Sequence, residues 1–447
     1  MPKINREQGA TDAQQATPAV PSASPEFLGK RLRITDGAIT FTGSPELRLE
    51  RDDAGRLKGV VGNLGGSGSP LTEGATLRSA RMAMASGLLT WLAIGDSNTQ
   101  GFYADTIANR YTRLAGNLLQ IATGDSASTG YRSRHTSIDY TASDWTTSGA
   151  LTEFATSGLG YGAVSMAANG GYIEITQTCD RFWVIYTGGN LIGKFGVQID
   201  GGGSVNVPTL APAAVTSGNV WDSGALSDAS HTVRITSTDA LFPCRIEGII
   251  FFRGNGNTSG SQGTLSASDA RSGTGVRCIN AGRFGAKAQT LAAISAASLW
   301  WTDSLPILAP RLVSLNFGVN EYGAGDSPVL LRRNLVTIMD RVSSVMSAVS
   351  LPPPSYLLII PHMVGSSATA FAPYAAMIRE AADRRGAAVF DFGEVTGWMG
   401  TSTVDTYGIG SSSDPDAARI HLSTAGHRMC GQLLADYLLR ALGGTRA

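Results

Sequence analysis

A dominant charge sign and long apolar runs are missing from this chain, and we expect no secretory leader. Its 447 residues include 35 basic and 35 acidic ones, and no basic run occurs, so nucleic-acid binding is not indicated. No stretch of about 18 apolar residues occurs, so we expect no membrane span. The first 25 residues are polar and lack the apolar centre of a signal peptide.

Cysteine is scarce, and no metal-binding pattern occurs. The four cysteines, Cys179, Cys244, Cys278 and Cys430, lack metal-ligand spacing. Cys179 and Cys244 both fall in strand-like segments and could face each other, although free buried thiols are the expected state. Because His, Asp and Glu do not recur at ligand spacing either, we expect no metal and no other cofactor.

Glycine is abundant instead, with 55 residues, and charged residues make up only 16% of the chain. Low charge with many Gly, Ser and Thr residues favours a β-rich protein with an extracellular or virion-type surface. Hydrophobic residues make up 43%, which at this length allows a sizeable core and about two or three domains.

The most informative segment is a Gly-Asp-Ser turn between an apolar run and a helical pattern. Residues 88–93 are typical of a buried strand, and Gly95, Asp96 and Ser97 follow it. We expect the next helix from Ala104 to about Ile121. A serine on such a turn exposes its hydroxyl near the amide-rich start of a helix, where an oxyanion can bind. The alternative is a serine that only caps the helix.

Three later segments extend this pattern. Asn280 to Gly285 precedes a helical pattern over 288–301, and Leu312 to Glu321 is an apolar strand that ends in Gly-x-Asn-Glu. Ile420 to Gly426 precedes a last amphipathic helix. The apolar positions of that helix are Met429, Leu433, Leu434, Tyr437 and Leu438.

Together the four segments resemble the blocks of the SGNH (GDSL-type) hydrolases, over residues 86–442 apart from an inserted stretch. The resemblance implies that Ser97 is the nucleophile and that His421 takes its proton and returns it to the leaving alcohol. It also implies an oxyanion hole made of the backbone N–H groups of Ser97 and Gly285 and the side-chain amide of Asn320. One such donor stabilises the transition state by roughly 3–4 kcal/mol. A side chain at position 285 would obstruct the approach of the substrate.

Simpler interpretations exist for these residues. Asn320 could cap a turn after its strand, and Gly285 could be an ordinary glycine at a helix start. His427 competes with His421, but it falls within the last helix and lacks the Ser-x-x-Gly spacing. The remaining histidines have no matching context and are expected to be structural or solvent-facing, although His362 could lie near the site: His135, His231 and His362.

One position departs from the family pattern. The aspartate expected three residues before the histidine is replaced by Ala418. Asp416 or Asp414 could orient the imidazole of His421, and we favour Asp416, while a backbone carbonyl is the third option. An orienting acid can change the rate by orders of magnitude.

The chain divides into segments of different character. Residues 1–28 are expected to be a disordered or attachment arm, and 29–70 to form β-hairpins followed by a Gly/Ser linker. The hydrolase domain is expected in two parts, 71–131 and 257–447. Between them, the short strand-like runs of 132–256 predict a jelly-roll-like β-sandwich, which resembles carbohydrate-binding modules. Three of its tryptophans could stack on sugars or lie in the core: Trp145, Trp183 and Trp221.

The hydrolase domain is predicted to be a three-layer α/β/α sandwich with a mostly parallel sheet. Active residues should lie at the carboxyl ends of its strands. No Gly-x-Ser-x-Gly elbow occurs, which argues against an α/β-hydrolase. The strands are expected near 88–94, 276–280, 312–317, 356–361 and 387–391.

These features predict a serine ester hydrolase, and the insert favours removal of O-acetyl groups from a polysaccharide such as a capsule, O-antigen or other cell-surface glycan. The alternatives are a lipase or thioesterase of the same family, and a catalytically impaired glycan-binding or structural tail protein. The arm and insert are similar to those of phage tail-associated deacetylases. That similarity implies a homotrimer attached to a virion through the arm; otherwise we expect a cytoplasmic protein. The acylated sugar and the oligomeric state stay open.

Overall fold

The computed structural model describes strands within the first 61 residues and most of the chain after residue 75. The described residues are 31–35, 38–42, 47–51, 57–61, 76–123, 128–135, 144–154, 158, 160, 162–209, 214–253, 262–266, 273–363, 366–395, 410 and 421–443. The expected arm at 1–28 and the Gly/Ser linker lie outside them. The chain divides into two units, 1–65 and 66–447, and each is described by itself.

The first unit holds an antiparallel sheet in which each strand pairs with the next one along the chain. Ile34 lies opposite Ile39, and Phe41 lies opposite Leu47. The hairpins predicted for this region are therefore present. The strands are β1 (Arg31–Thr35), β2 (Ala38–Thr42), β3 (Leu47–Arg51) and β4 (Leu57–Val61).

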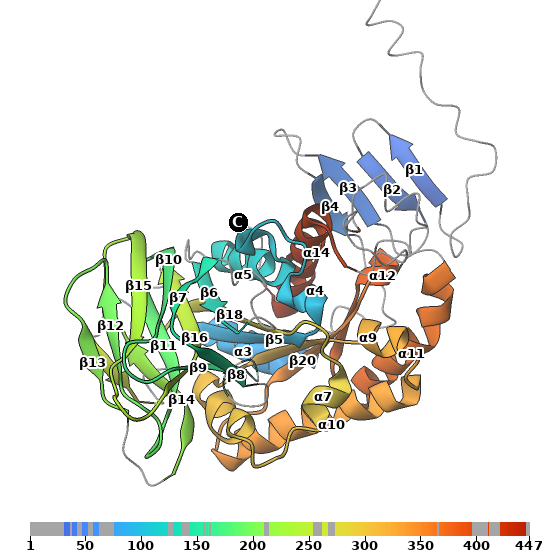
Figure 1. Cartoon of the computed structure of the whole chain (residues 1–447). Helices are drawn as coiled ribbons and strands as arrows, with labels where there is room; N and C mark the ends of the chain where they lie inside the picture. The colour runs from blue at the N-terminus through green and yellow to red at the C-terminus, as the bar shows by residue number, and fades with distance from the viewer. Residues whose placement is uncertain are drawn as a thin grey trace, which may run out of the picture. The chain divides into compact units, whose positions relative to one another are not determined.

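The second unit contains a five-stranded parallel sheet in the order β18-β5-β19-β20-β21 (Figure 1). Its strands are β18 (Gly275–Gly282), β5 (Leu88–Gly95), β19 (Leu312–Asn316), β20 (Ser355–Ile360) and β21 (Ala388–Asp391). The apolar residues of β5, β19 and β20 are buried almost throughout, as expected for a parallel sheet that helices cover on both faces. The predicted parallel sheet is confirmed.

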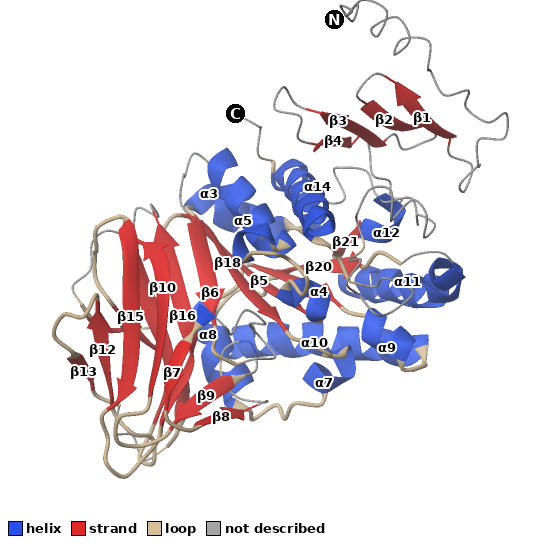
Figure 2. Cartoon of the chain, turned by 45° about the horizontal axis from the view of Figure 1, so that its top comes forward, coloured by secondary structure: helices blue, strands red, loops and turns tan. Residues whose placement is uncertain are grey.

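Helices form a layer on each face of this sheet (Figure 2). One layer holds α3 (Arg78–Ser86), α5 (Tyr111–Ala122) and α14 (Thr424–Leu442), and the other holds α7 (Ala288–Ala292), α10 (Pro328–Ala348) and α11 (Ser366–Arg385). Shorter helical turns are α4 (Ser97–Gln100), η1 (Ile107–Asn109), η4 (Trp300–Ser304), α8 (Leu305–Leu308), α9 (Val319–Gly323) and α12 (Phe392–Val395). This is the predicted three-layer architecture. No helix in the described part of the chain is long and apolar enough to cross a membrane.

The helix predicted from Ala104 begins only at Tyr111. The backbone is extended at Thr106 (ψ 159°) and at Arg110 (ψ 135°), so helical hydrogen bonds cannot run through this segment. The residues between α4 and α5 instead form a loop with one short turn, η1.

The helix predicted over 288–301 ends at Ala292. Turn hydrogen bonds replace helical ones beyond it: Ser298 N donates to Ser295 O (2.9 Å), and Trp301 N donates to Ser298 O (2.9 Å). The buried pair Trp300 and Trp301 then begins η4.

Two antiparallel sheets make up the inserted β domain. The five-stranded sheet has the order β13-β12-β15-β10-β7, and the seven-stranded sheet has the order β17-β14-β11-β16-β9-β8, with β6 paired to β16. The strands are β6 (Ser128–Arg132), β7 (Thr146–Ser148), β8 (Leu151–Phe154), β9 (Ala163–Met166), β10 (Tyr172–Cys179), β11 (Arg181–Gly188), β12 (Phe195–Ile199), β13 (Val205–Val207), β14 (Thr216–Asp222), β15 (Ala229–Ser237), β16 (Cys244–Arg253) and β17 (Gly263–Leu265).

Strand β11 is buried on both faces. Phe182 and Val184 belong to the core between the two antiparallel sheets. Trp183 and Ile185 point to the other face and belong to the core of the hydrolase domain. The inserted domain is therefore packed against the hydrolase domain through a shared core. All three tryptophans considered for sugar contact are core residues, at most 6% exposed: Trp145, Trp183 and Trp221.

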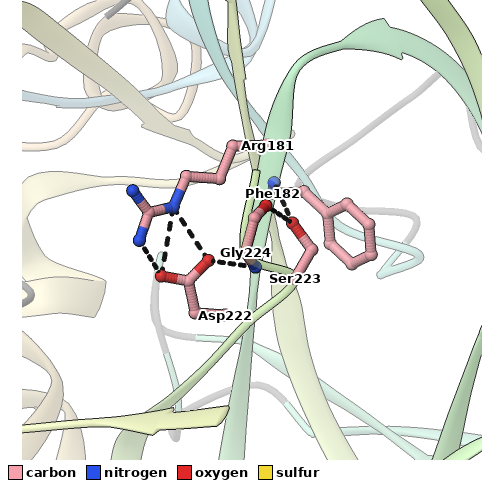
Figure 3. A network of polar contacts seen from close by, with 5 residues as sticks. All are labelled: Arg181, Phe182, Asp222, Ser223 and Gly224. Carbon is pink, nitrogen blue, oxygen red and sulfur yellow. Dashed lines mark hydrogen bonds and ion pairs between the residues drawn. The ribbon is translucent and has the colours of Figure 1, made fainter. Parts of the chain in front are cut away.

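A buried ion pair joins β11 to β14 inside the insert (Figure 3). The Nε of Arg181 donates to both carboxylate oxygens of Asp222, at 2.8 and 3.1 Å, and its Nη2 also donates to that carboxylate. Gly224 N donates to Asp222 Oδ1 (2.9 Å), and Phe182 N donates to Ser223 Oγ (3.0 Å). Arg181 is 5% exposed and Asp222 is fully buried.

We predict that Asp222→Ala lowers the free energy of unfolding by about 3–5 kcal/mol, because it removes the carboxylate that is paired with a buried guanidinium. The matched control is Asp228→Ala, which breaks a bidentate pair with Arg253 whose two side chains are each 51% exposed. That change should cost less than about 1 kcal/mol. Urea unfolding followed by tryptophan fluorescence measures both; equal losses would contradict the prediction.

Candidate active site

Three parallel strands end side by side at one edge of the sheet. Gly95, the last residue of β5, lies opposite Gly282 of β18 and Asn316 of β19. The loops that follow these strands therefore start from neighbouring positions, as open α/β sheets require of a site. These loops carry three of the predicted residues: Ser97, Gly285 and Asn320.

Ser97 is the first residue of helix α4 and is 3% exposed. Its Oγ lies 2.8 Å from Nε2 of His421, although the two residues are 324 positions apart. Asp96 caps the helix, because its carboxylate accepts a hydrogen bond from Asn98 N (2.9 Å). Position 282 must be glycine, because a Cβ there would collide with the backbone of this helix. The structure thus brings the predicted hydroxyl and imidazole together.

His421 lies against two aromatic rings. Its ring centroid is 5.1 Å from that of Phe102 and 5.6 Å from that of Tyr103. When Nε2 accepts the serine hydroxyl, a neutral imidazole carries its hydrogen on Nδ1. The candidate partners of Nδ1, Asp416 and Asp414, lie outside the described residues, as does Ala418. Asp416 as the orienting acid therefore stays a prediction.

Asn98, which the sequence did not single out, connects the serine segment to the histidine segment. It is 2% exposed, and its Oδ1 accepts a hydrogen bond from Leu422 N (3.1 Å). Asp105 N donates to the hydroxyl of Thr424 (2.9 Å), which joins the same two segments a second time. Because Asn98 follows Ser97 directly and Leu422 follows the histidine, this bond positions the hydroxyl relative to the imidazole.

Gly285 has a φ of 68°, a conformation that strains any residue with a side chain. A Cβ at this position would meet no described atom within 4 Å, so it would project into the open space that a substrate needs. In the described ranges, no acceptor is bonded to the backbone N–H of Ser97 or of Gly285. Both amides can therefore donate to an oxyanion.

Asn320 and Glu321 join their own loop to the loop that carries Gly285. Asn320 Nδ2 donates one hydrogen to Ala286 O (2.9 Å), which leaves its second amide hydrogen for a ligand. This bond reaches the neighbouring loop, so Asn320 does more than cap its own turn. Glu321, 2% exposed, accepts from Ala288 N (2.6 Å) and from Gly318 N (2.9 Å). Burial raises the pKa of Glu321 above its ordinary value.

His427, the alternative to His421, lies in α14 and is a structural residue. It is fully buried, and its Nε2 donates to Phe102 O (3.0 Å). Burial lowers its pKa to about 4, so the ring is neutral at physiological pH. The other histidines also make packing or ion-pair contacts: His135 with Glu153 (3.6 Å), His231 with Asp200 (2.7 Å) and His362 with the ring of Phe392 (5.9 Å).

The described cysteines offer no competing nucleophile. All four are buried and free, so Cys179 and Cys244 form no disulfide. Burial raises the thiol pKa of Cys179, Cys244 and Cys278 to about 12, so these thiols are protonated at neutral pH. No group of three or more His, Cys, Asp and Glu side chains that could hold a metal ion occurs among the residues described.

Asp96 gives the site a pH-dependent stability. Burial raises the pKa of its carboxyl to about 7 from 3.8, and the charge of Glu321 raises it further, while the amide of Asn98 lowers it. A carboxyl with a raised folded-state pKa contributes stability below pH 3.8, and this contribution is lost as the pH rises through about 7.

We predict that Asp96→Asn unfolds with a weaker pH dependence than the wild type between pH 4 and about 8. In the wild type, the raised pKa of Asp96 corresponds to a fall in the free energy of unfolding on the order of 4 kcal/mol over this pH range. Asn keeps the oxygen that accepts from Asn98 N but does not ionise. Urea unfolding at several pH values measures the difference, and parallel pH profiles for the two proteins would contradict it.

Comparisons with known proteins are consistent with this site. Residues 252–429 match the model of the GDSL-like Lipase/Acylhydrolase family, a segment that holds Gly285, Asn320 and His421 but begins beyond Ser97. A solved structure described as a peptidoglycan O-acetylesterase in action is 16% identical, with a TM-score of 0.58. The match covers 85% of this chain and 97% of the chain in that structure, which establishes the shared fold.

Two other solved structures are similar over smaller parts of the chain. A family two carbohydrate esterase from Cellvibrio japonicus is 10% identical, with a TM-score of 0.26, and covers 71% of this chain and 99% of its own. A carbohydrate acetylesterase from Sinorhizobium meliloti is 18% identical, with a TM-score of 0.27, and covers 40% and 89%. TM-scores this low do not establish a shared fold. No curated protein matches the chain.

Proposed function

We propose that this chain, whose residues 252–429 match the GDSL-like lipase/acylhydrolase family model, is a serine carboxylic ester hydrolase that removes O-acetyl groups from a polysaccharide. The observation that carries this proposal is the 2.8 Å contact between Ser97 Oγ and His421 Nε2. A hydroxyl bonded to an imidazole can lose its proton as it attacks a carbonyl carbon. The loops with Gly285 and Asn320 start beside it.

In the first half of the proposed reaction, Ser97 Oγ attacks the acetyl carbonyl carbon and its proton passes to His421 Nε2. The carbonyl oxygen becomes an oxyanion, which accepts hydrogen bonds from the amides of Ser97 and Gly285 and from Asn320. When the intermediate collapses, the bond to the sugar oxygen breaks, and this oxygen takes the proton from the imidazolium. The products are an acetyl-serine and a free sugar hydroxyl.

The second half repeats these steps with water. His421 removes a proton from the water molecule as its oxygen attacks the acetyl-serine. The same donors stabilise the second oxyanion, and the imidazolium returns its proton to Ser97 Oγ as acetic acid leaves. Each preorganised donor contributes roughly 3–4 kcal/mol of transition-state stabilisation.

The polysaccharide part of the proposal is supported by the architecture. The peptidoglycan O-acetylesterase structure covers 85% of this chain, which is more than the hydrolase domain alone, so the likeness extends into the inserted β domain. The insert is packed on the hydrolase through a shared core rather than on a free linker, as shown by Trp183 and Ile185. A large polymer bound near the active site can therefore contact both domains in a fixed geometry.

We also propose, from the sequence pattern alone, that the protein is part of a phage virion. A polar arm at 1–28, the adjoining β-hairpins and the insert are similar to those of phage tail-associated deacetylases. In this setting the arm attaches the protein to the virion and the chain forms a homotrimer.

We predict that the purified protein releases acetate from acetylated bacterial polysaccharides and from small acetate esters. Ser97→Ala and His421→Ala should each lower kcat by at least about 10³-fold, because the nucleophile and its base act as one unit. Enzymatic assay of free acetate measures this, with melting temperature as the control for folding. Long-chain fatty esters in the same panel distinguish a lipase from an acetylesterase.

Full activity of a folded Ser97→Ala protein would refute the nucleophile. Turnover of long-chain esters above acetate esters would refute the deacetylase assignment and favour a lipase. Glycan binding without turnover of any ester would favour the impaired binding protein.

A further inference from the structure

Phe284, the residue before Gly285, is an exposed aromatic residue at the active site. Its side chain is 52% exposed, and among the exposed large hydrophobic residues of the described ranges it is the one aromatic. Scattered exposed aliphatic residues are ordinary, whereas an exposed ring beside reacting groups is typical of a ligand contact. The other exposed large hydrophobic residues in the described ranges are Met82, Ile121, Leu191, Leu241, Val329 and Val349.

Ring contacts connect Phe284 to the imidazole. Its ring centroid is 5.0 Å from that of Phe102, which is 5.1 Å from that of His421. Tyr103 completes the group, 4.4 Å from Phe102 and edge-on to His421 at 5.6 Å. These distances are those of favourable aromatic packing. The three rings therefore form an apolar surface that extends from the catalytic imidazole to an exposed edge.

This surface is rigidly supported. Phe102 N donates to Ser97 O (3.0 Å), and Phe102 O accepts from the buried His427 (3.0 Å). Tyr103 has a φ of 64°, a conformation that costs free energy in a non-glycine residue and persists only where the surroundings fix it. This backbone conformation and the contacts of the Tyr103 ring with Phe102 and His421 place the ring beside the imidazole.

We propose that Phe284, supported by Phe102 and Tyr103, is the subsite for the sugar ring that carries the acetyl group. A pyranose has a face of C–H groups and a rim of hydroxyls, so that face packs on a flat aromatic ring while the rim stays in water. With the ring on Phe284, an acetyl group at its rim reaches Ser97 and the amide of Gly285. This inference rests on the proposed function and adds to it the part that selects a sugar over other alcohols.

The test compares two esters with the same acyl group, glucose pentaacetate and ethyl acetate. An aryl acetate is avoided because its own ring could stack on Phe284. Phe284→Ala should lower kcat/KM for the sugar ester about 10-fold, mainly through KM, and leave ethyl acetate within about two-fold. Phe284→Trp should retain the preference for the sugar. The control is Leu241→Ala, because Leu241 is 79% exposed on the inserted domain.

A binding measurement makes the test independent of turnover. In Ser97→Ala protein, calorimetry with glucose pentaacetate should show about 10-fold weaker binding after Phe284→Ala. Unchanged binding, or equal losses on both esters, would overturn the subsite. Loss of sugar affinity without any ester turnover would support the subsite and contradict the proposed function, so the two failures are distinguishable.

Discussion

The active site depends on the register of three parallel strands. Because Gly95 lies opposite both Gly282 and Asn316, the loops after β5, β18 and β19 begin at the same edge of the sheet. Backbone bonds extend this register by one residue on each side: Arg283 N donates to Gly95 O (2.9 Å), and Asp96 N donates to Asn316 O (3.2 Å). The relative positions of Ser97, Gly285 and Asn320 follow from this strand pairing. A shift of one strand by a residue would separate them.

This register also explains how the chain tolerates a domain between its serine and glycine segments. The insert leaves the hydrolase after α5 and returns directly into β18, which pairs with β5. Arg277 of β18 is buried, and its guanidinium stacks over the ring of Trp183 at 4.5 Å. Burial lowers the pKa of Arg277 to about 9, and the nearby Arg181 lowers it further. The insert thus packs on the edge strand of the catalytic sheet while the strand order around Ser97 stays intact.

Local sequence was sufficient to predict the parts of the site that lie at strand ends. The apolar runs identified the parallel strands, and short motifs after three of these strands identified Ser97, Gly285 and Asn320. A fourth motif, before α14, identified His421, whose Nε2 lies 2.8 Å from Ser97 Oγ. The helix bounds after Ser97 could not be predicted in this way. The segment that contains Tyr103 and Thr106 contacts α14, far along the chain, where Asp105 N donates to Thr424 Oγ1.

The residues that position the catalytic groups were missed for the same reason. Asn98 acts through Leu422, and Glu321 acts through Ala288, so each function depends on the relative placement of two loops. The sequence also could not decide whether the tryptophans of the insert stack on sugars or lie in the core. β11 is buried on both faces, which places Trp183 in the hydrolase core and removes the usual alternation of apolar and polar residues.

Catalysis at this site requires that one oxyanion is bound by three donors from different parts of the chain. A crystal structure of the protein after reaction with a fluorophosphonate tests it most directly, because the phosphoryl oxygen stands in for the oxyanion. We expect a covalent bond at Ser97 Oγ, with this oxygen about 2.7–3.1 Å from Ser97 N, Gly285 N and Asn320 Nδ2. A bond at another residue, or a phosphoryl oxygen directed away from these donors, would contradict it.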